Sequence, residues 1–145
     1  MKLSTKGKYA LRMMLDLAEH RSKGIISLKD IADRQGISKK YLEQIVPLLH
    51  RPKMILTHRG PQGGYSLAKQ PERYTVGDIL RTAEGGISPF TDVDSAHKAG
   101  ESKAAAMTVE VWRGLEKVIT DYLDHLTLQD VLDRFGDAGK YEFNI

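Results

Sequence analysis

Residues 27–49 read SLKDIADRQGISKKYLEQIVPLL, and this stretch decides the fold. Its apolar residues recur at helical spacing on both sides of Gly36, which predicts two short helices joined by a tight turn. Ser27 and Ser38 stand where each helix would begin, with hydroxyls placed to accept early backbone N–H groups. The stretch therefore predicts a helix-turn-helix.

The second of these helices, expected over about 39–50, would enter a DNA major groove with its N-terminal residues on base edges. Pro47 removes one backbone hydrogen bond, so a bend or an early end is expected there. Glutamine suits adenine, a carboxylate suits cytosine, and lysine suits guanine or phosphate. A solvated helix face explains any one of these residues, but it explains the whole set less well. The predicted contacts from this helix are Ser38, Lys39, Lys40, Tyr41, Glu43 and Gln44.

A second element, a strand–turn–strand pattern, follows the helices. Residues 54–58 and 65–68 are strand-like and flank 59–64, whose glycines suit a hairpin with positive φ angles. Such a tip would form a wing that reaches the DNA backbone or a minor groove. Phosphate binding in the manner of a P-loop is disfavoured, because the turn leads into a strand and lacks the Gly-Lys-Ser/Thr ending. The predicted wing contacts are Arg59, Gly60, Gln62 and Gly63.

Charge is distributed unevenly along the chain. Residues 1–75 carry 15 Lys/Arg against 6 Asp/Glu, a formal charge of +9, whereas residues 76–145 carry 7 against 13, or −6. A basic half points to a polyanionic partner, and Lys6 and Lys8 are expected to neutralise phosphates with the residues above. The alternative, a protein–protein module on the same scaffold, has no need of this basic half.

The fold class predicted from these patterns is mainly α with a small β-hairpin. Further helices are expected over about 5–22, 75–84, 105–125 and 127–135. The organisation predicted is a winged helix-turn-helix domain over 1–84, a sensor loop over 85–104, a dimerisation helix with a short terminal helix over 105–135, and a tail over 136–145.

The long helix carries an apolar stripe too broad for the surface of a monomer. It either packs on the N-terminal domain or forms the two-fold interface that palindromic half-sites require, and we favour the homodimer. The residues expected at that interface are Trp112, Leu115, Val118, Ile119, Tyr122 and Leu123.

Other classes find little support. The five histidines lack metal-ligand spacing, and no catalytic triad or carboxylate pair stands out, so an enzyme is not expected. With neither a membrane-length apolar run nor a signal peptide, a cytoplasmic location is expected.

The chain resembles, over its whole length, the winged-helix regulators that include the iron–sulfur cluster regulator, the nitrite-sensitive repressor and the cysteine-metabolism repressor. The resemblance rests on motifs at 3–10, 36–44, 59–65 and 76–79 and on the segment 112–128. It implies homodimers on roughly palindromic promoter DNA, controlling iron–sulfur or cysteine metabolism genes. By position, residues 40, 43 and 44 match the recognition contacts of the family and Arg59 its wing contact; the glutamate matching Glu43 helps to discriminate operator classes.

The chain departs from the family's cluster-binding members in the sensor loop. Those members hold a [2Fe–2S] cluster through three loop cysteines, the last six residues before the tryptophan, and this chain has no cysteine. Either the ligand cysteines have been replaced by alanine, which we favour slightly, or the chain is a naturally cluster-free member. The positions concerned are among Ala96, Ala99, Ala104, Ala105 and Ala106, and a further ligand position, at Val109, cannot coordinate.

The aromatic tail ending in Ile145 is similar to that of the cysteine-metabolism repressors. For that group the implied partner is cysteine synthase, whose pocket would receive the terminal carboxylate. A tail packed on its own domain is the alternative, and we favour it.

Overall fold

The computed structural model describes residues 3–88 and 100–138. It contains six α-helices and one two-stranded sheet within those residues, as the sequence predicts. In chain order the elements are α1 (Thr5–Glu19), η1 (Arg21–Lys23), α2 (Leu28–Gln35), α3 (Lys39–His50), β1 (Ile55–His58), β2 (Gly64–Leu67), η2 (Pro71–Arg73), α4 (Val76–Glu84), α5 (Lys103–Asp124) and α6 (Leu128–Phe135).

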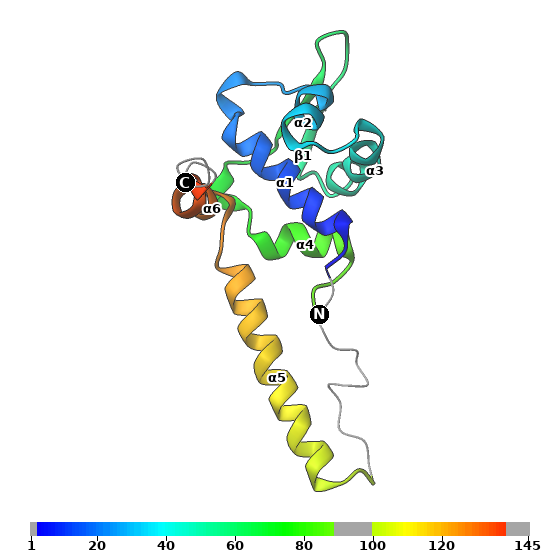
Figure 1. The fold of residues 1–145 in the computed structure, drawn as a ribbon, viewed down its shortest axis with the longest axis vertical. Helices are drawn as coiled ribbons and strands as arrows, with labels where there is room; N and C mark the ends of the chain where they lie inside the picture. Colours follow the sequence, from blue (N-terminus) through cyan, green and yellow to red (C-terminus); the bar gives the residue numbers. More distant parts are fainter. Residues whose placement is uncertain (1–2, 89–99, 139–145) are drawn as a thin grey trace, which may run out of the picture.

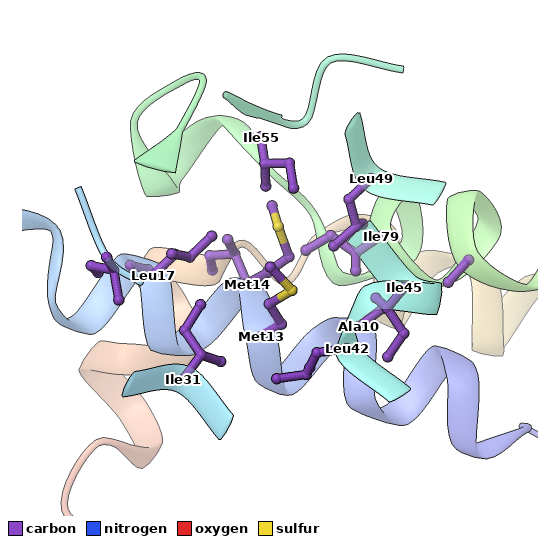
Figure 2. Close-up of a cluster of buried hydrophobic side chains, with 14 of the residues drawn as sticks. Ala10, Met13, Met14, Leu17, Ile31, Leu42, Ile45, Leu49, Ile55 and Ile79 are labelled. Carbon is purple, nitrogen blue, oxygen red and sulfur yellow. The ribbon is translucent and has the colours of Figure 1, made fainter. Parts of the chain in front are cut away.

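The N-terminal helices pack around one apolar core (Figure 2). α1 supplies its centre, because Met13 and Met14 are fully buried between α2, α3 and the hairpin. Full burial of a side chain of this size stabilises the fold by about 1.5–3 kcal/mol relative to leaving it exposed to water. Ile31, Leu42, Ile45, Leu49, Ile55 and Ile79 complete the cluster from the surrounding elements.

The predicted caps of the helix-turn-helix are confirmed. The Ser27 hydroxyl accepts the Asp30 N–H at 3.1 Å, and the Ser38 hydroxyl accepts the Tyr41 N–H at 3.1 Å. Gly36 lies between the helices with φ of +64°, a left-handed conformation that costs glycine little. Local sequence signals were therefore sufficient for this motif.

Two boundary predictions were wrong. α1 ends at Glu19 rather than 22, because residues 21–23 form a separate 3₁₀ turn closed by Gly24 at φ +79°. α5 begins at Lys103 rather than 105, with the Ser102 hydroxyl as its cap. α3 spans Lys39–His50, the range expected from the sequence, and it does not end early at Pro47.

Figure 1 shows α5 projecting away from the packed N-terminal helices, while α6 returns to lie beside α1. The terminal helix therefore packs against α1 and η2, on the N-terminal half of the chain. Leu128, fully buried, belongs to the same core as α1 and α3. Within the described part of the chain, no helix combines the length and apolar character that crossing a bilayer requires.

Candidate nucleic-acid interface

The two faces of α3 are sharply different. Leu42, Ile45 and Leu49 have no exposed surface and anchor the inner face in the core. The outer face presents side chains that are all exposed, namely Lys39, Lys40, Glu43 and Gln44. Ser38, whose hydroxyl caps α3, is also exposed, and the first turn of the helix is therefore open to a ligand.

Tyr41 differs from the other predicted contacts because it is half-buried. Its ring meets that of Tyr9 edge to face, with centroids 5.4 Å apart and planes at 80°, and the Arg12 guanidinium lies 5.2 Å from the Tyr9 centroid. Tyr41 thus ties α3 to α1.

A buried ion pair fixes α2 against α1. The Asp16 carboxylate, on α1 and only 1% exposed, accepts from Arg34 Nε at 2.9 Å and Nη2 at 2.8 Å. The Gln35 amide donates to it at 2.8 Å. The hydrogen bond to Asp16 raises the pKa of Arg34 above its ordinary value. A carboxylate buried in this way needs all three donors, so these hydrogen bonds fix the orientation of α2 against α1.

The predicted hairpin pairs Ile55 with Leu67 and His58 with Gly64, one residue from the expected strand limits. Of the turn glycines, only Gly60 has a positive φ, at +114°. Gly63 and Gly64 are required for close approach instead: a Cβ there would lie 2.2 Å from the carbonyl oxygens of His58 and Ile26 respectively. The expectation of positive φ angles was therefore wrong for these two glycines.

Helix and hairpin meet in one groove of about 440 Å³. Lys39 and Glu43 line it from α3, and Arg59, Gly60 and Gly63 line it from the turn, so the predicted helix and wing residues share one concave surface. Lys29 and Tyr65 also line it and were not predicted, since α2 and β2 reach the groove only through tertiary packing. The exposed side chains of Lys40, Gln44 and Gln62 lie outside this lining.

Lys6 and Lys8 are exposed on the first turns of α1, away from the groove. Glu84, at the end of α4, holds this helix start through one carboxylate oxygen. Its Oε1 accepts from Ser4 N at 3.0 Å, Ser4 Oγ at 2.5 Å and Gly7 N at 2.9 Å. These hydrogen bonds, that of the Ser4 side chain first, lower the pKa of Glu84.

The apolar face of α5 is exposed along its length. Leu115, Val118 and Tyr122, predicted for a subunit interface, are 46%, 66% and 59% exposed. Met107 and Val111 extend the same line of residues toward the helix start, at 55% and 59%. Trp112, Ile119 and Leu123 are half-buried, and Leu123 packs on a second cluster formed by Val76, Leu80, Ile87 and Leu126.

The end of α5 is joined firmly to the start of α4. Arg81 Nη2 lies 2.7 Å from Asp124 Oδ2, and this hydrogen bond lowers the pKa of Asp124. Gly77 permits the approach, since a Cβ there would lie 2.1 Å from Asp124 Oδ1. The Val76 N–H donates to the Leu126 carbonyl at 2.8 Å. These contacts therefore join the end of α5 directly to α4, one of the N-terminal helices.

The donor set does not fit an iron–sulfur cluster. The chain has no thiol, and the described residues contain no group of three or more His, Cys, Asp or Glu side chains able to hold a metal ion. Ala104, Ala105 and Ala106 form the first turn of α5, and Val109 is buried. Ala96 and Ala99 lie outside the described residues.

Comparison with known proteins gives consistent matches. The model of the Rrf2 family, described as an iron-dependent transcriptional regulator, matches residues 3–134. The HTH-type transcriptional regulator CymR of Bacillus subtilis is 37% identical, with both chains covered completely. The HTH-type transcriptional regulator IscR of Aliivibrio salmonicida is 36% identical over 91% of this chain and 77% of its own.

Solved structures agree with the predicted fold. CymR, described as the global cysteine regulator of B. subtilis, superposes with a TM-score of 0.79 at 36% identity, over 92% of this chain and 98% of that one. IscR of T. potens superposes with a TM-score of 0.75 at 41% identity, over 92% and 88%. The winged-helix prediction is confirmed, and the curated relatives are transcriptional regulators rather than enzymes.

Proposed function

The chain belongs to the Rrf2 family of transcriptional regulators, and on that premise we propose that it reads promoter DNA through the groove between α3 and the wing. The observation that carries the proposal is the meeting of Lys39 and Glu43 with Arg59 in one exposed groove. The outer face of α3 supplies donors and an acceptor for base edges, and the glycine turn lets Arg59 approach the backbone or minor groove closely.

In this proposal the predicted residues divide by role. Glu43 and Gln44 read bases, whereas Lys6, Lys8 and Lys40 neutralise phosphates with the basic N-terminal half around them. We keep the predicted organisation as part of this proposal, with residues 1–84 binding DNA and α5 joining two copies. The line from Met107 to Tyr122 is the face that a second copy would cover, which places two α3 helices on one duplex.

Selection from a random DNA pool would provide the operator, and titrations at several salt concentrations would test the assignment. Gln44→Ala should weaken specific binding by about 1–3 kcal/mol and relax specificity at one position. Arg59→Ala should weaken binding and lower the salt slope by about 0.9 if it meets one phosphate. Arg51→Ala, at the opposite end of α3, is the control. Unchanged affinity in both the Gln44 and the Arg59 variant would refute the assignment.

We further propose that the genes controlled belong to cysteine or sulfur metabolism and that the chain acts without a cluster. CymR of B. subtilis is 37% identical to this chain, and its solved structure is described as that of a global cysteine regulator, which supports this assignment. The absence of any cysteine excludes thiolate ligation of a cluster by this chain. The proposal adopts the second of the two explanations left open by the sequence, a naturally cluster-free member.

A cysteine synthase partner would accompany such a role. The tail ending in Ile145 lies outside the described residues, and the proposal rests on its aromatic sequence and free terminal carboxylate. Titration of cysteine synthase with the full chain and with a chain lacking Ile145 tests it. Binding by the full chain alone is expected; equal binding by both forms would exclude insertion of the terminus.

A further inference from the structure

A second cleft, of about 900 Å³, adjoins the wing and has a lining that differs from that of the groove at α3 in all residues but one. The end of α1, the turn at 21–25, β2 and the loop at 68–73 line it. It shares His58 with the α3 groove, and no residue of α2 or α3 lines it. DNA seated on α3 would therefore leave this cleft open.

The chemistry of the cleft is basic around an apolar floor. Leu17 and Leu67 form part of the floor, and Arg21, Lys69 and Arg73 bring three positive charges to the walls. The described lining contains neither aspartate nor glutamate. Arg21 Nη1 is held by the Ala18 carbonyl at 2.7 Å, whereas Lys69 and Arg73 take part in no ion pair within the described residues. Three cations converging without a carboxylate favour a multiply charged anion.

The walls of the cleft are fixed before any ligand arrives. Tyr74, 2% exposed, donates its hydroxyl proton to the Met54 carbonyl at 2.7 Å and accepts the Ala68 and Lys69 N–H groups, both at 3.0 Å. This hydroxyl holds the loop that carries Lys69. Next to the lining residues Ile25 and Ser66, Ile26 and Tyr65 exchange two backbone hydrogen bonds, at 2.9 and 2.8 Å, which tie the turn at 21–25 to β2. A preformed cleft loses little conformational freedom on binding.

We propose that this cleft binds a small organic anion with two or more negative charges, a polycarboxylate or a phosphate ester, whose apolar part rests on Leu17 and Leu67. Its volume lies within the range of ligand sites for small metabolites. His58 and Ser66, joined at 2.8 Å between the two strands of the wing, supply polar atoms at the wall. The binding itself does not depend on the proposed DNA contacts.

The probes are citrate and inorganic pyrophosphate, titrated into the full chain at constant ionic strength set with sodium chloride and followed by amide NMR and calorimetry. We expect saturable shifts at Ala68 and Gln70. Saturation by citrate alone identifies a carboxylate ligand, saturation by pyrophosphate alone identifies a phosphate, and either or both supports the site. Saturation by neither overturns it.

Two double variants of equal charge change locate the binding. Lys69→Ala with Arg73→Ala should weaken the affinity for the bound probe at least tenfold. Arg51→Ala with Lys117→Ala, outside the cleft, should leave it within twofold. Equal weakening in both variants would reveal only general charge attraction and overturn the site. So would unchanged probe binding in the cleft variant together with a loss of operator affinity, which would assign these cations to DNA.

Discussion

The contact between Gly7 and Glu84 predicts that Gly7→Ala destabilises the wild-type protein but stabilises a variant that lacks the Glu84 side chain. Gly7 lies in the first turn of α1, and a Cβ there would stand 2.3 Å from Glu84 Oε1. Gly7→Ala therefore displaces the carboxylate that accepts three hydrogen bonds from Ser4 and Gly7. The three atoms nearest to that Cβ all belong to the Glu84 side chain, so in a Glu84→Ala background we expect the substitution to gain the helix preference of alanine.

The magnitudes follow from the geometry. A hydrogen bond to a charged group contributes about 1.5–3 kcal/mol when buried, but Ser4 is exposed, so we assign about 2 kcal/mol to the three together. Alanine in place of glycine at the helix start stabilises the helix by about 0.5 kcal/mol. Gly7→Ala should thus destabilise the protein by about 1.5 kcal/mol, whereas in a Glu84→Ala background it should stabilise by about 0.5 kcal/mol.

Urea unfolding at pH 7, at one fixed protein concentration, measures the four free energies of this cycle. Glu84→Gln, which keeps the shape and removes the charge, should lie between wild type and Glu84→Ala. Because the pKa of Glu84 is lowered in the folded protein, its contribution is complete above its ordinary pKa and is lost as pH falls through the lowered value. The same free-energy change for Gly7→Ala in both backgrounds would refute the reasoning.

Two other predictions concern α5. Asp124→Asn removes the charge paired with Arg81 and should destabilise the protein by about 1 kcal/mol in thermal melts, a modest value because both side chains are about one-third exposed. The control, Asp121→Asn in an exposed pair with Lys117, should cost under about 0.5 kcal/mol in the same melts, and equal destabilisation by both variants would contradict a special role of the Arg81–Asp124 pair. Val118→Glu should convert the proposed homodimer to monomer in sedimentation experiments, whereas an unchanged dimer would place the interface elsewhere.

Local signals predicted the helix-turn-helix well, because its determinants lie within a few residues of one another. The hydroxyls of Ser27 and Ser38 each cap the helix that follows, as their spacing indicated. The range of α3 was also predicted, and the early end considered at Pro47 does not occur, because the cost of a proline depends on its surroundings in the folded chain.

The sequence by itself determined the order of helices, the two-stranded wing and the basic N-terminal half, since periodicity, caps and charge are written along the chain. Tertiary structure alone decided which charges meet. The pairing of Asp16 with Arg34, the hold of Glu84 on Ser4 and the junction of Arg81 with Asp124 span 18, 80 and 43 residues. The basic cleft lined by β2 and the loop at 68–73 could not be predicted from the sequence either, because its cations come from separate segments that converge only when the core packs.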